Sequence, residues 1–371
     1  MKMEFYYPSP DETVWEAATA EQAGFDPAKI EAAARFASEQ ETTWPRDLRA
    51  HLEAGCFEPP PWNEIIGPVE PRGGPNGLIL HRGRILAQWG DTRRADMVFS
   101  VAKSCLGLLT GLALADGLIR DLDEPVGATV TDGGFDGIHN GAITWRHLLQ
   151  QTSEWEGTLW GKSDIIDRNR KLGGDKPDAQ KGQARPLQAP GSFWEYNDVR
   201  VNRLSLALLR RFGRSLPEIF RERIMAPIGA SDSWRWAGYD NSFVEIGGQE
   251  VQSVSGGGHW GGGLFIHAED LARLGLLMLA RGAWGARQVL ARDWIDASVE
   301  PAALNASYGL LWWLNTGRRD YPSASAASYF AKGAGGNYIW VDPESELVAV
   351  MRWLDAAQLD RFIGMVMAAR R

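Results

Sequence analysis

The chain of 371 residues is long enough for one large domain or two, with a sizeable hydrophobic core. Its net charge of -8 and its 23% of charged residues describe an ordinary acidic globular protein, which argues against a nucleic acid or an anionic membrane as partner. The first ten residues contain no basic segment followed by an apolar one, so we expect no secretory signal and a cytoplasmic location.

The cysteines and histidines form no pattern of a disulfide or metal site. Cys56 and Cys105 are the only cysteines, and Cys105 falls in an apolar run, which favours core packing. The six histidines lack the His-Glu-x-x-His spacing and any other close ligand spacing. We therefore expect neither a metal ion nor another cofactor.

The first part of the chain predicts a helix, an irregular connection and a hairpin. A helical pattern lies within residues 12–40 and opens after Asp26-Pro27. Prolines, glycines and scattered aromatic residues fill residues 44–76, which predicts a surface connection. Two short apolar runs within residues 77–90 predict a β-hairpin.

A Ser-x-x-Lys motif at Ser100 and Lys103 follows the hairpin and opens an apolar run. Positions i and i+3 share one face of a helix, so the Ser100 hydroxyl and the Lys103 amine should lie side by side. Lys103 is the only charged residue between Val101 and Ala115, so burial should lower its pKa and let the neutral amine accept the serine proton. Such a motif arises by chance about once per few hundred residues and is weak on its own. The polar residues and glycines of the run argue against a membrane span.

Two helices and a long loop are predicted in the middle of the chain. Thr144 can cap a helix over residues 145–149, and an amphipathic helix covers residues 199–212. Residues 154–190 are rich in charge and glycine, and we expect a loop region that can act as a lid. Within it, residues 157–163 miss the spacing of a phosphate-binding loop by one residue.

The last part of the chain predicts a glycine loop followed by strands and helices. The run 255–263 contains Gly-x-Gly-x-x-Gly, but a strand rather than a helix follows it, which disfavours a dinucleotide site. The remaining predicted elements are helices over 268–282 and 356–369 and strands over 308–314, 338–342 and 347–353.

Together these elements predict an α+β fold in two parts. Antiparallel strands and helices from both termini, residues 1–98 and 245–371, should form one sheet domain. Residues 99–244 should form a mostly helical domain, with the active site between the two.

The number of tryptophans, 17, is unusual, and many of them fall outside simple helix or strand periodicity. Large aromatic residues beside glycine-rich loops often line clefts for apolar ligands. We therefore expect Trp155 and Trp260 to contact a substrate, together with His259 of the glycine loop. Core packing is the alternative for any single tryptophan.

Three motifs in chain order carry a family resemblance. They are Ser100-Val101-Ala102-Lys103, Tyr196-Asn197-Asp198 and Lys332-Gly333-Ala334-Gly335-Gly336. The arrangement resembles the β-lactamase and penicillin-binding-protein superfamily, whose signature is Ser-x-x-Lys, Tyr-x-Asn and Lys-Thr-Gly or a relative. Within it, residues 77–353 are most similar to class C β-lactamases, family VIII carboxylesterases and 6-aminohexanoate-dimer hydrolases.

The resemblance implies a β-lactamase-like fold and a role for each matched residue. Ser100 would be the nucleophile, Lys103 its base and Tyr196 the proton relay to the leaving group. The backbone amides of Ser100 and Ala334 would form the oxyanion hole. Core packing is the alternative for Tyr196.

Two departures from the family pattern affect the expected substrate. Asp198 stands where many members have an asparagine, and Gly333-Ala334 replaces the Thr-Gly that follows the lysine. In members that handle β-lactams, the threonine hydroxyl helps to hold the substrate carboxylate. We expect Asp198, Lys332 and Gly333 to contact the substrate, and a carboxylate beside a missing hydroxyl to disfavour anionic β-lactams.

The sequence thus predicts a metal-free serine hydrolase that cleaves a small ester or amide through an acyl-enzyme on Ser100. A β-lactamase or a D-amino-acid peptidase is the alternative within enzymes. A catalytically silent binding module on the same fold is the alternative of another class, and the intact Ser100, Lys103 and Tyr196 disfavour it. The expected partner is a small-molecule substrate, and a homodimer is compatible with the sequence.

Overall fold

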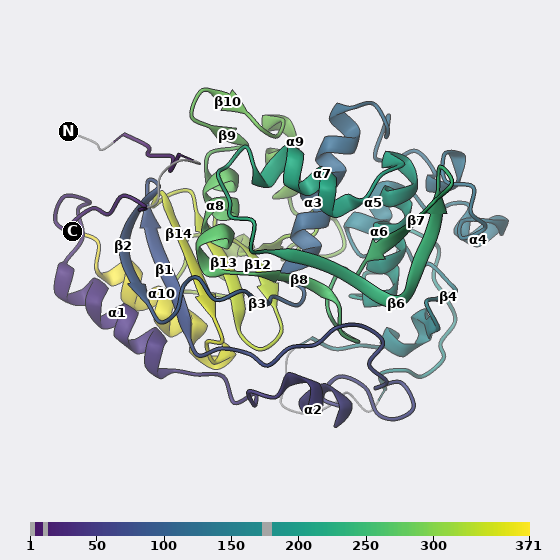
Figure 1. The fold of residues 1–371 in the computed structure, drawn as a ribbon, viewed down its shortest axis with the longest axis horizontal. Coiled ribbons are helices and arrows are strands. Elements are labelled where there is room, and N and C mark those ends of the chain that lie inside the picture. The colour runs from purple at the N-terminus through teal and green to yellow at the C-terminus, as the bar shows by residue number, and fades with distance from the viewer. Residues whose placement is uncertain (1–3, 10–13, 173–179) are drawn as a thin grey trace.

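The computed structural model describes residues 4–9, 14–172 and 180–371 (Figure 1). Its central feature is a six-stranded antiparallel sheet, whose strands in spatial order are β11 (Trp313–Leu314), β12 (Tyr329–Gly333), β13 (Asn337–Asp342), β14 (Leu347–Arg352), β1 (Asn76–His81) and β2 (Arg84–Trp89). The predicted hairpin, β1 and β2, pairs with the last strand of the chain, β14. The α+β fold with a sheet built from both termini is therefore confirmed.

Helices cover both faces of this sheet. α1 (Pro27–Glu39) and α10 (Leu359–Ala368) lie side by side on one face, on the side of the molecule where the C-terminus lies (Figure 1). α8 (Ala268–Leu279) packs on the other face. Alternate residues of β1 enter these two cores, as a strand buried on both faces requires.

The helix predicted within residues 12–40 begins at Pro27, in agreement with the start expected from Asp26-Pro27. The Asp26 side chain accepts hydrogen bonds from the amides of Ala28 and Lys29 and so caps α1. Residues 12 and 13 of the prediction lie outside the described residues.

A second sheet has the order β3 (Asp96–Met97), β8 (Gly263–Ile266), β6 (Arg235–Ile246) and β7 (Gln249–Val254). The β6–β7 hairpin was not predicted. Gly238 interrupts the apolar pattern, and the pairing register shifts between Gly238 and Phe243, so the alternation of a regular strand is absent. The predicted domain boundary at residue 245 falls within β6, and the division into two domains stays a prediction.

α3 (Val101–Ala115) runs through the centre of the helical part, where it contacts α6 (Asp198–Phe212) and α7 (Leu216–Phe220) (Figure 1). Nearly all of its residues are buried, which explains why it is apolar on every face. In the described ranges, no helix is both long enough and apolar enough to cross a membrane. The cytoplasmic location and the homodimer stay predictions.

The remaining elements are short. They are α2 (Leu48–Glu53), α4 (Gly137–Asn140), α5 (Trp145–Leu149), α9 (Arg292–Ser298), the π-helical turn Arg221–Met225, the 3-10 turns Val126–Ala128, Asp164–Asp167, Thr316–Arg318 and Ala356–Gln358, and the strand pairs β4 (Thr158–Leu159) with β5 (Lys162–Ser163) and β9 (Ala283–Trp284) with β10 (Arg287–Gln288).

Two further predictions agree only in part with the observed elements. The strand predicted over 308–314 is mostly irregular, because only Trp313 and Leu314 pair with β12. The predicted lid, residues 154–190, contains β4, β5 and a 3-10 turn, and its residues 173–179 lie outside the described residues.

The buried Arg352 of β14 joins the two sheets. Its guanidinium donates hydrogen bonds to Asn337 Oδ1 at 2.7 Å, to the Ile266 carbonyl at 2.7 Å and to the Met97 carbonyl at 3.0 Å. Met97 lies three residues before Ser100. This arginine therefore fixes the start of α3 against the end of the six-stranded sheet.

Candidate active site

Ser100 lies at the N-cap of α3, where the chain turns from β3 into the helix. Phe99 before it has a φ of 49°, a left-handed conformation that is uncommon outside glycine. The i, i+3 spacing places Lys103 Nζ 2.9 Å from Ser100 Oγ, side by side as the motif predicts. Ser100 is half-buried, whereas the Lys103 side chain is only 2% exposed.

Tyr196 reaches the same serine from the loop before α6. Its hydroxyl faces the Ser100 side chain, and this interaction opposes the rise in the pKa of Tyr196 that burial causes. Its ring centre lies 5.0 Å from Lys103 Nζ and 5.3 Å from the Arg170 guanidinium. Asn197 caps α6 with its side-chain oxygen and so holds the start of that helix beside Tyr196. Lys103 of the first motif and Tyr196 of the second thus lie close to the Ser100 hydroxyl.

Asp198 lies buried behind this group. Its Oδ1 accepts a hydrogen bond from Lys103 Nζ at 2.5 Å, and its Oδ2 accepts one from Arg170 at 2.6 Å. Oδ2 also lies 3.1 Å from Nδ1 of His259. Asp198 is 3% exposed, and both of its oxygens are ion-paired. The structure therefore does not present Asp198 to a substrate, contrary to our expectation. Its negative charge is also not free to repel an anionic substrate.

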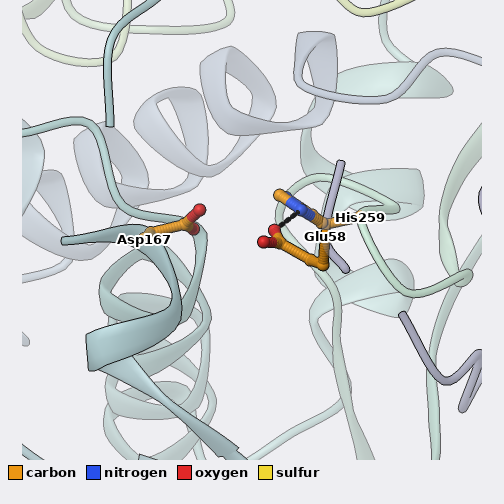
Figure 2. Close-up of side chains that lie close together, drawn as sticks. All are labelled: Glu58, Asp167 and His259. Atoms are coloured by element: carbon orange, nitrogen blue, oxygen red, sulfur yellow. Dashed lines mark ion pairs between the residues drawn. The ribbon is translucent and has the colours of Figure 1, made fainter. Parts of the chain in front are cut away.

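A second layer of charged residues lies behind Asp198. His259 stands between Asp198 and Glu58, and its Nε2 forms an ion pair with Glu58 Oε1 (Figure 2). Asp167 faces this pair across a gap (Figure 2). Lys181 Nζ bonds Glu58 Oε1 at 2.5 Å and lies 3.1 Å from Asp167 Oδ1. His259 is therefore engaged by carboxylates, and the structure does not present it to a substrate.

Glu58, Asp167 and His259 also have the spacing of a metal site, since their ligand atoms lie within 4.8 Å of one another. The Lys181 ammonium already supplies a positive charge to both carboxylates and donates a third hydrogen bond to the Phe57 carbonyl at 3.1 Å. The chemistry of this set thus fits a charge network better than a metal centre.

The glycine-rich loop 255–263 packs directly on the ion pair of Lys103 and Asp198. A Cβ at Gly257 would collide with Asp198 Oδ1 and would lie 2.7 Å from Lys103 Nζ. The absence of a side chain at Gly257 therefore lets the loop backbone cover the pair and carry His259 to the second oxygen of Asp198.

The structure places the predicted aromatic contacts in the core. Trp260 is 1% exposed and stacks on His259, with 4.5 Å between ring centres. Trp155 is buried and lines a hollow of about 510 Å³ together with α6 and residues 132–160. Ser100 does not line that hollow, so the hollow does not bring Trp155 to the candidate nucleophile.

Other aromatic rings lie next to Tyr196. The ring centres of Trp313, Tyr308 and Trp194 lie 5.6, 6.3 and 6.5 Å from that of Tyr196. Trp313 also contacts Lys332, whose Nζ lies 4.8 Å from the centre of the indole ring. Of these rings, Trp194 and Trp313 are half-buried and form an aromatic wall next to Tyr196, whereas Tyr308 is buried.

The end of β12 lies against the residues that precede Ser100. A Cβ at Gly333 would collide with the Val98 carbonyl, so this position admits only glycine. In the part of the chain that the structure describes, the backbone amides of Ser100 and Ala334 have no hydrogen-bond acceptor. Both are therefore able to donate to a bound group.

Burial sets the direction of the pKa shift for Lys103 and Tyr196, whereas neighbouring cations set it for Asp198. It lowers the pKa of Lys103, although the Asp198 carboxylate pulls in the other direction. Burial raises the pKa of Tyr196, and the charge of Asp198 adds to the rise. Although burial opposes it, Lys103 and His259 hold the pKa of Asp198 well below its usual range. Burial also lowers the pKa of Lys332 to about 8.

The sequence profile of the Beta-lactamase family matches residues 78–354, which is most of the chain. The chain belongs to the β-lactamase family. A search of curated proteins finds no match.

Solved structures share the fold of this β-lactamase-family chain. A Bacillus anthracis protein described as a candidate 6-aminohexanoate-dimer hydrolase has 17% identity and a TM-score of 0.58, over 94% of this chain and 84% of its own. EstCE1, a hydrolase with promiscuous acyltransferase activity, has 15% identity and a TM-score of 0.58, over 92% and 98%. A β-lactamase from Mycobacterium bovis has 19% identity and a TM-score of 0.55, over 78% and 92%. At these identities, the likeness shows the fold alone.

The charged residues behind Asp198 were not found from the sequence of this β-lactamase-family chain. Glu58 lies in the irregular connection, whereas Asp167, Arg170 and Lys181 lie in the predicted lid. The i, i+3 spacing of Asp167 and Arg170 was a local signal of a pair. Only the fold brings these loops together beside α6.

Proposed function

We propose that this protein is a serine hydrolase that cleaves a small ester or amide through an acyl-enzyme on Ser100. The observation that carries the proposal is the 2.9 Å contact between Ser100 Oγ and the buried Lys103 Nζ. The Tyr196 hydroxyl on the same serine supports it, as do the two backbone amides that are able to donate. A silent binding module has no use for a buried lysine against a serine.

The reaction follows from these positions. The neutral amine of Lys103 accepts the Ser100 proton while Oγ bonds to the carbonyl carbon of the substrate. The carbonyl oxygen becomes negative and accepts hydrogen bonds from the amides of Ser100 and Ala334, with each such donor contributing about 3 kcal/mol. Tyr196 gives its proton to the leaving group as the bond of that group to the carbonyl carbon breaks, and it takes the proton of Lys103 in exchange, so that Lys103 is neutral again. Water then attacks the acyl carbon, and the same groups reverse the proton transfers.

The surroundings favour a neutral substrate with an apolar group. The half-buried rings of Trp194 and Trp313 offer aromatic surface beside Tyr196. Gly333 offers no hydroxyl to a substrate carboxylate, and the Val98 carbonyl blocks any side chain there. This combination favours esters and amides over β-lactams.

A β-lactamase or a D-amino-acid peptidase is the second candidate. Lys332 favours it, because this half-buried cation rests on the rings of Trp313 and Tyr321 and could attract a substrate carboxylate. The substrate comparison in the Discussion separates the two candidates.

Labelling with a fluorophosphonate tests the proposed nucleophile. We expect the wild type to gain one adduct on Ser100, located by mass spectrometry, and Ser100→Ala to gain none. Ser104→Ala is the matched control, because Ser104 lies on the same helix and its hydroxyl donates instead to the Leu311 carbonyl at 2.7 Å. A folded wild type that does not label would favour the silent binding module.

A further inference from the structure

The lysine that should accept the serine proton is held by a carboxylate. Asp198 contacts Lys103 through Oδ1 and His259 through Oδ2. A carboxylate at this distance favours the charged form of a lysine, whereas a general base must be neutral. Some other positive charge must therefore offset Asp198 when Lys103 acts as a base.

The buried charges around Asp198 are close to balance. Ion pairs join the carboxylates of Glu58, Asp167 and Asp198, the cations of Lys103, Arg170 and Lys181, and the ring of His259. Tyr196, Cys56 and Lys162 also face this cluster, and among the described residues none of them forms an ion pair with it. The rings of Phe57 and Trp260 pack against the His259 ring, with centres 4.4 and 4.5 Å away, so water has little access to it. With the carboxylates, Arg170 and Lys181 charged, one further positive charge makes the cluster neutral.

Lys103 and His259 are the two residues that can carry this charge. If both were charged, the buried cluster would hold an uncompensated positive charge, and if both were neutral, a buried carboxylate would lack its counterion; both states are costly. The two residues bind opposite oxygens of the same carboxylate. When one of the two residues is protonated, its positive charge therefore reduces the extent to which Asp198 stabilises a proton on the other.

We propose that His259 is a positioning residue that carries this charge as an imidazolium between Glu58 and Asp198, and thereby leaves Lys103 as the neutral base. The inference rests on the proposed function. When Lys103 takes the Ser100 proton, the new positive charge is balanced by the oxyanion that forms on the substrate.

The protonation tendencies of the two residues agree with this assignment. Although burial opposes it, Glu58, Asp167 and Asp198 raise the pKa of His259. Burial lowers the pKa of Lys103. Both directions act toward a proton on the imidazole, which has a carboxylate at each ring nitrogen.

The pH dependence of His259→Gln tests the inference. Both the rate of fluorophosphonate labelling of Ser100 and the kcat/KM for a p-nitrophenyl ester are measured across the pH range. We expect the acidic limb of both profiles to move to higher pH by at least about one unit, because Asp198 then retains the proton on Lys103. A purely structural role for His259 would lower the rates at every pH and leave the limb in place, which would overturn the inference.

A double variant and a control sharpen this test. In His259→Gln combined with Asp198→Asn, the carboxylate that needs an offset is gone, so the limb should move back to lower pH; no return would contradict the proposed route through Asp198. His267→Gln is the matched control, because His267 is also buried but pairs with Asp270 at 3.3 Å. Its limb should stay at the wild-type pH, and an equal shift would overturn the inference.

If His259→Gln does not fold, His259→Asn tests the same charge. It also removes the imidazolium and should move the limb in the same direction, and an unmoved limb would again overturn the inference. Failure of the proposed function has a different signature, namely a wild type that neither labels nor turns over an ester at any pH.

Discussion

Lys103 Nζ lies 2.5 Å from Asp198 Oδ1 and 2.9 Å from Ser100 Oγ. The aspartate that replaces the asparagine of the Tyr-x-Asn motif therefore acts on the charge of the proposed base. Arg170 and His259 pair with the same carboxylate, so the negative charge of Asp198 is neutralised within the protein and does not act on a substrate.

Lys103→Arg should lower the kcat/KM for an activated aryl ester by about a thousandfold or more, because a guanidinium does not deprotonate. In the wild type, activity should fall as the pH drops, since burial lowers the pKa of Lys103 and only its neutral form is a base. A pH–rate profile of both proteins measures the effect. An arginine variant as active as the wild type would remove Lys103 from the mechanism.

Asp198→Asn should lower the free energy of unfolding by about 3 to 5 kcal/mol, because it leaves buried cations without their counterion. Its acidic limb should lie at lower pH than that of the wild type, since Lys103 loses the carboxylate that favours its proton. Urea unfolding measures the first effect.

Asp123→Asn is the control for this change. Asp123 is 59% exposed and pairs with Arg146 on the surface, so its loss should cost about 1 kcal/mol or less. Equal stability losses in the two variants would mean that the buried network around Asp198 is not the stabilising unit described above.

Gly257→Ala should damage the ion pair of Lys103 and Asp198. The new Cβ would collide with Asp198 Oδ1, whose paired position leaves it little room to move. We expect a loss of about 1 to 3 kcal/mol in unfolding free energy together with at least a tenfold loss of ester turnover. In Gly74→Ala, the nearest atom to the new Cβ is the end of the Arg46 side chain at 3.3 Å, so both quantities should stay near the wild type. A fully active Gly257→Ala would show that the glycine-rich loop does not pack tightly against the ion pair of Lys103 and Asp198.

A neutral short-chain p-nitrophenyl ester should exceed nitrocefin in kcat/KM by at least about a hundredfold, a gap of about 2.7 kcal/mol. The reason is that Gly333 lacks a hydroxyl for the substrate carboxylate. Because Asp198 is already neutralised by its partners, Asp198→Asn should leave this ratio unchanged. Hydrolysis of nitrocefin as fast as the ester would favour the β-lactamase candidate.

The sequence predicted the parts of the fold that have regular patterns. The β1–β2 hairpin has short apolar runs around a turn, and α3 has an uninterrupted apolar run. β6 escaped prediction because Gly238 and the register shift after it break the alternation. These features depend on pairing with β7, which is a tertiary effect.

The candidate site could be predicted only where a motif carried it. Ser100, Lys103 and Tyr196 were expected and do meet in the structure. The position of Asp198 in its motif could not reveal that its side chain is buried. Glu58 and Lys181 come from segments far apart in sequence, so no local pattern could pair them.

The most direct measurement of the central proposal is the mass of the protein trapped during turnover of p-nitrophenyl acetate. We expect one acetyl group on Ser100, formed together with a burst of nitrophenolate, and none in Ser100→Ala. The variant should lose about a thousandfold or more of the turnover while its thermal midpoint stays almost unchanged. An acetyl group on another residue, or a Ser100→Ala variant that keeps about a tenth of the activity, would contradict the proposal.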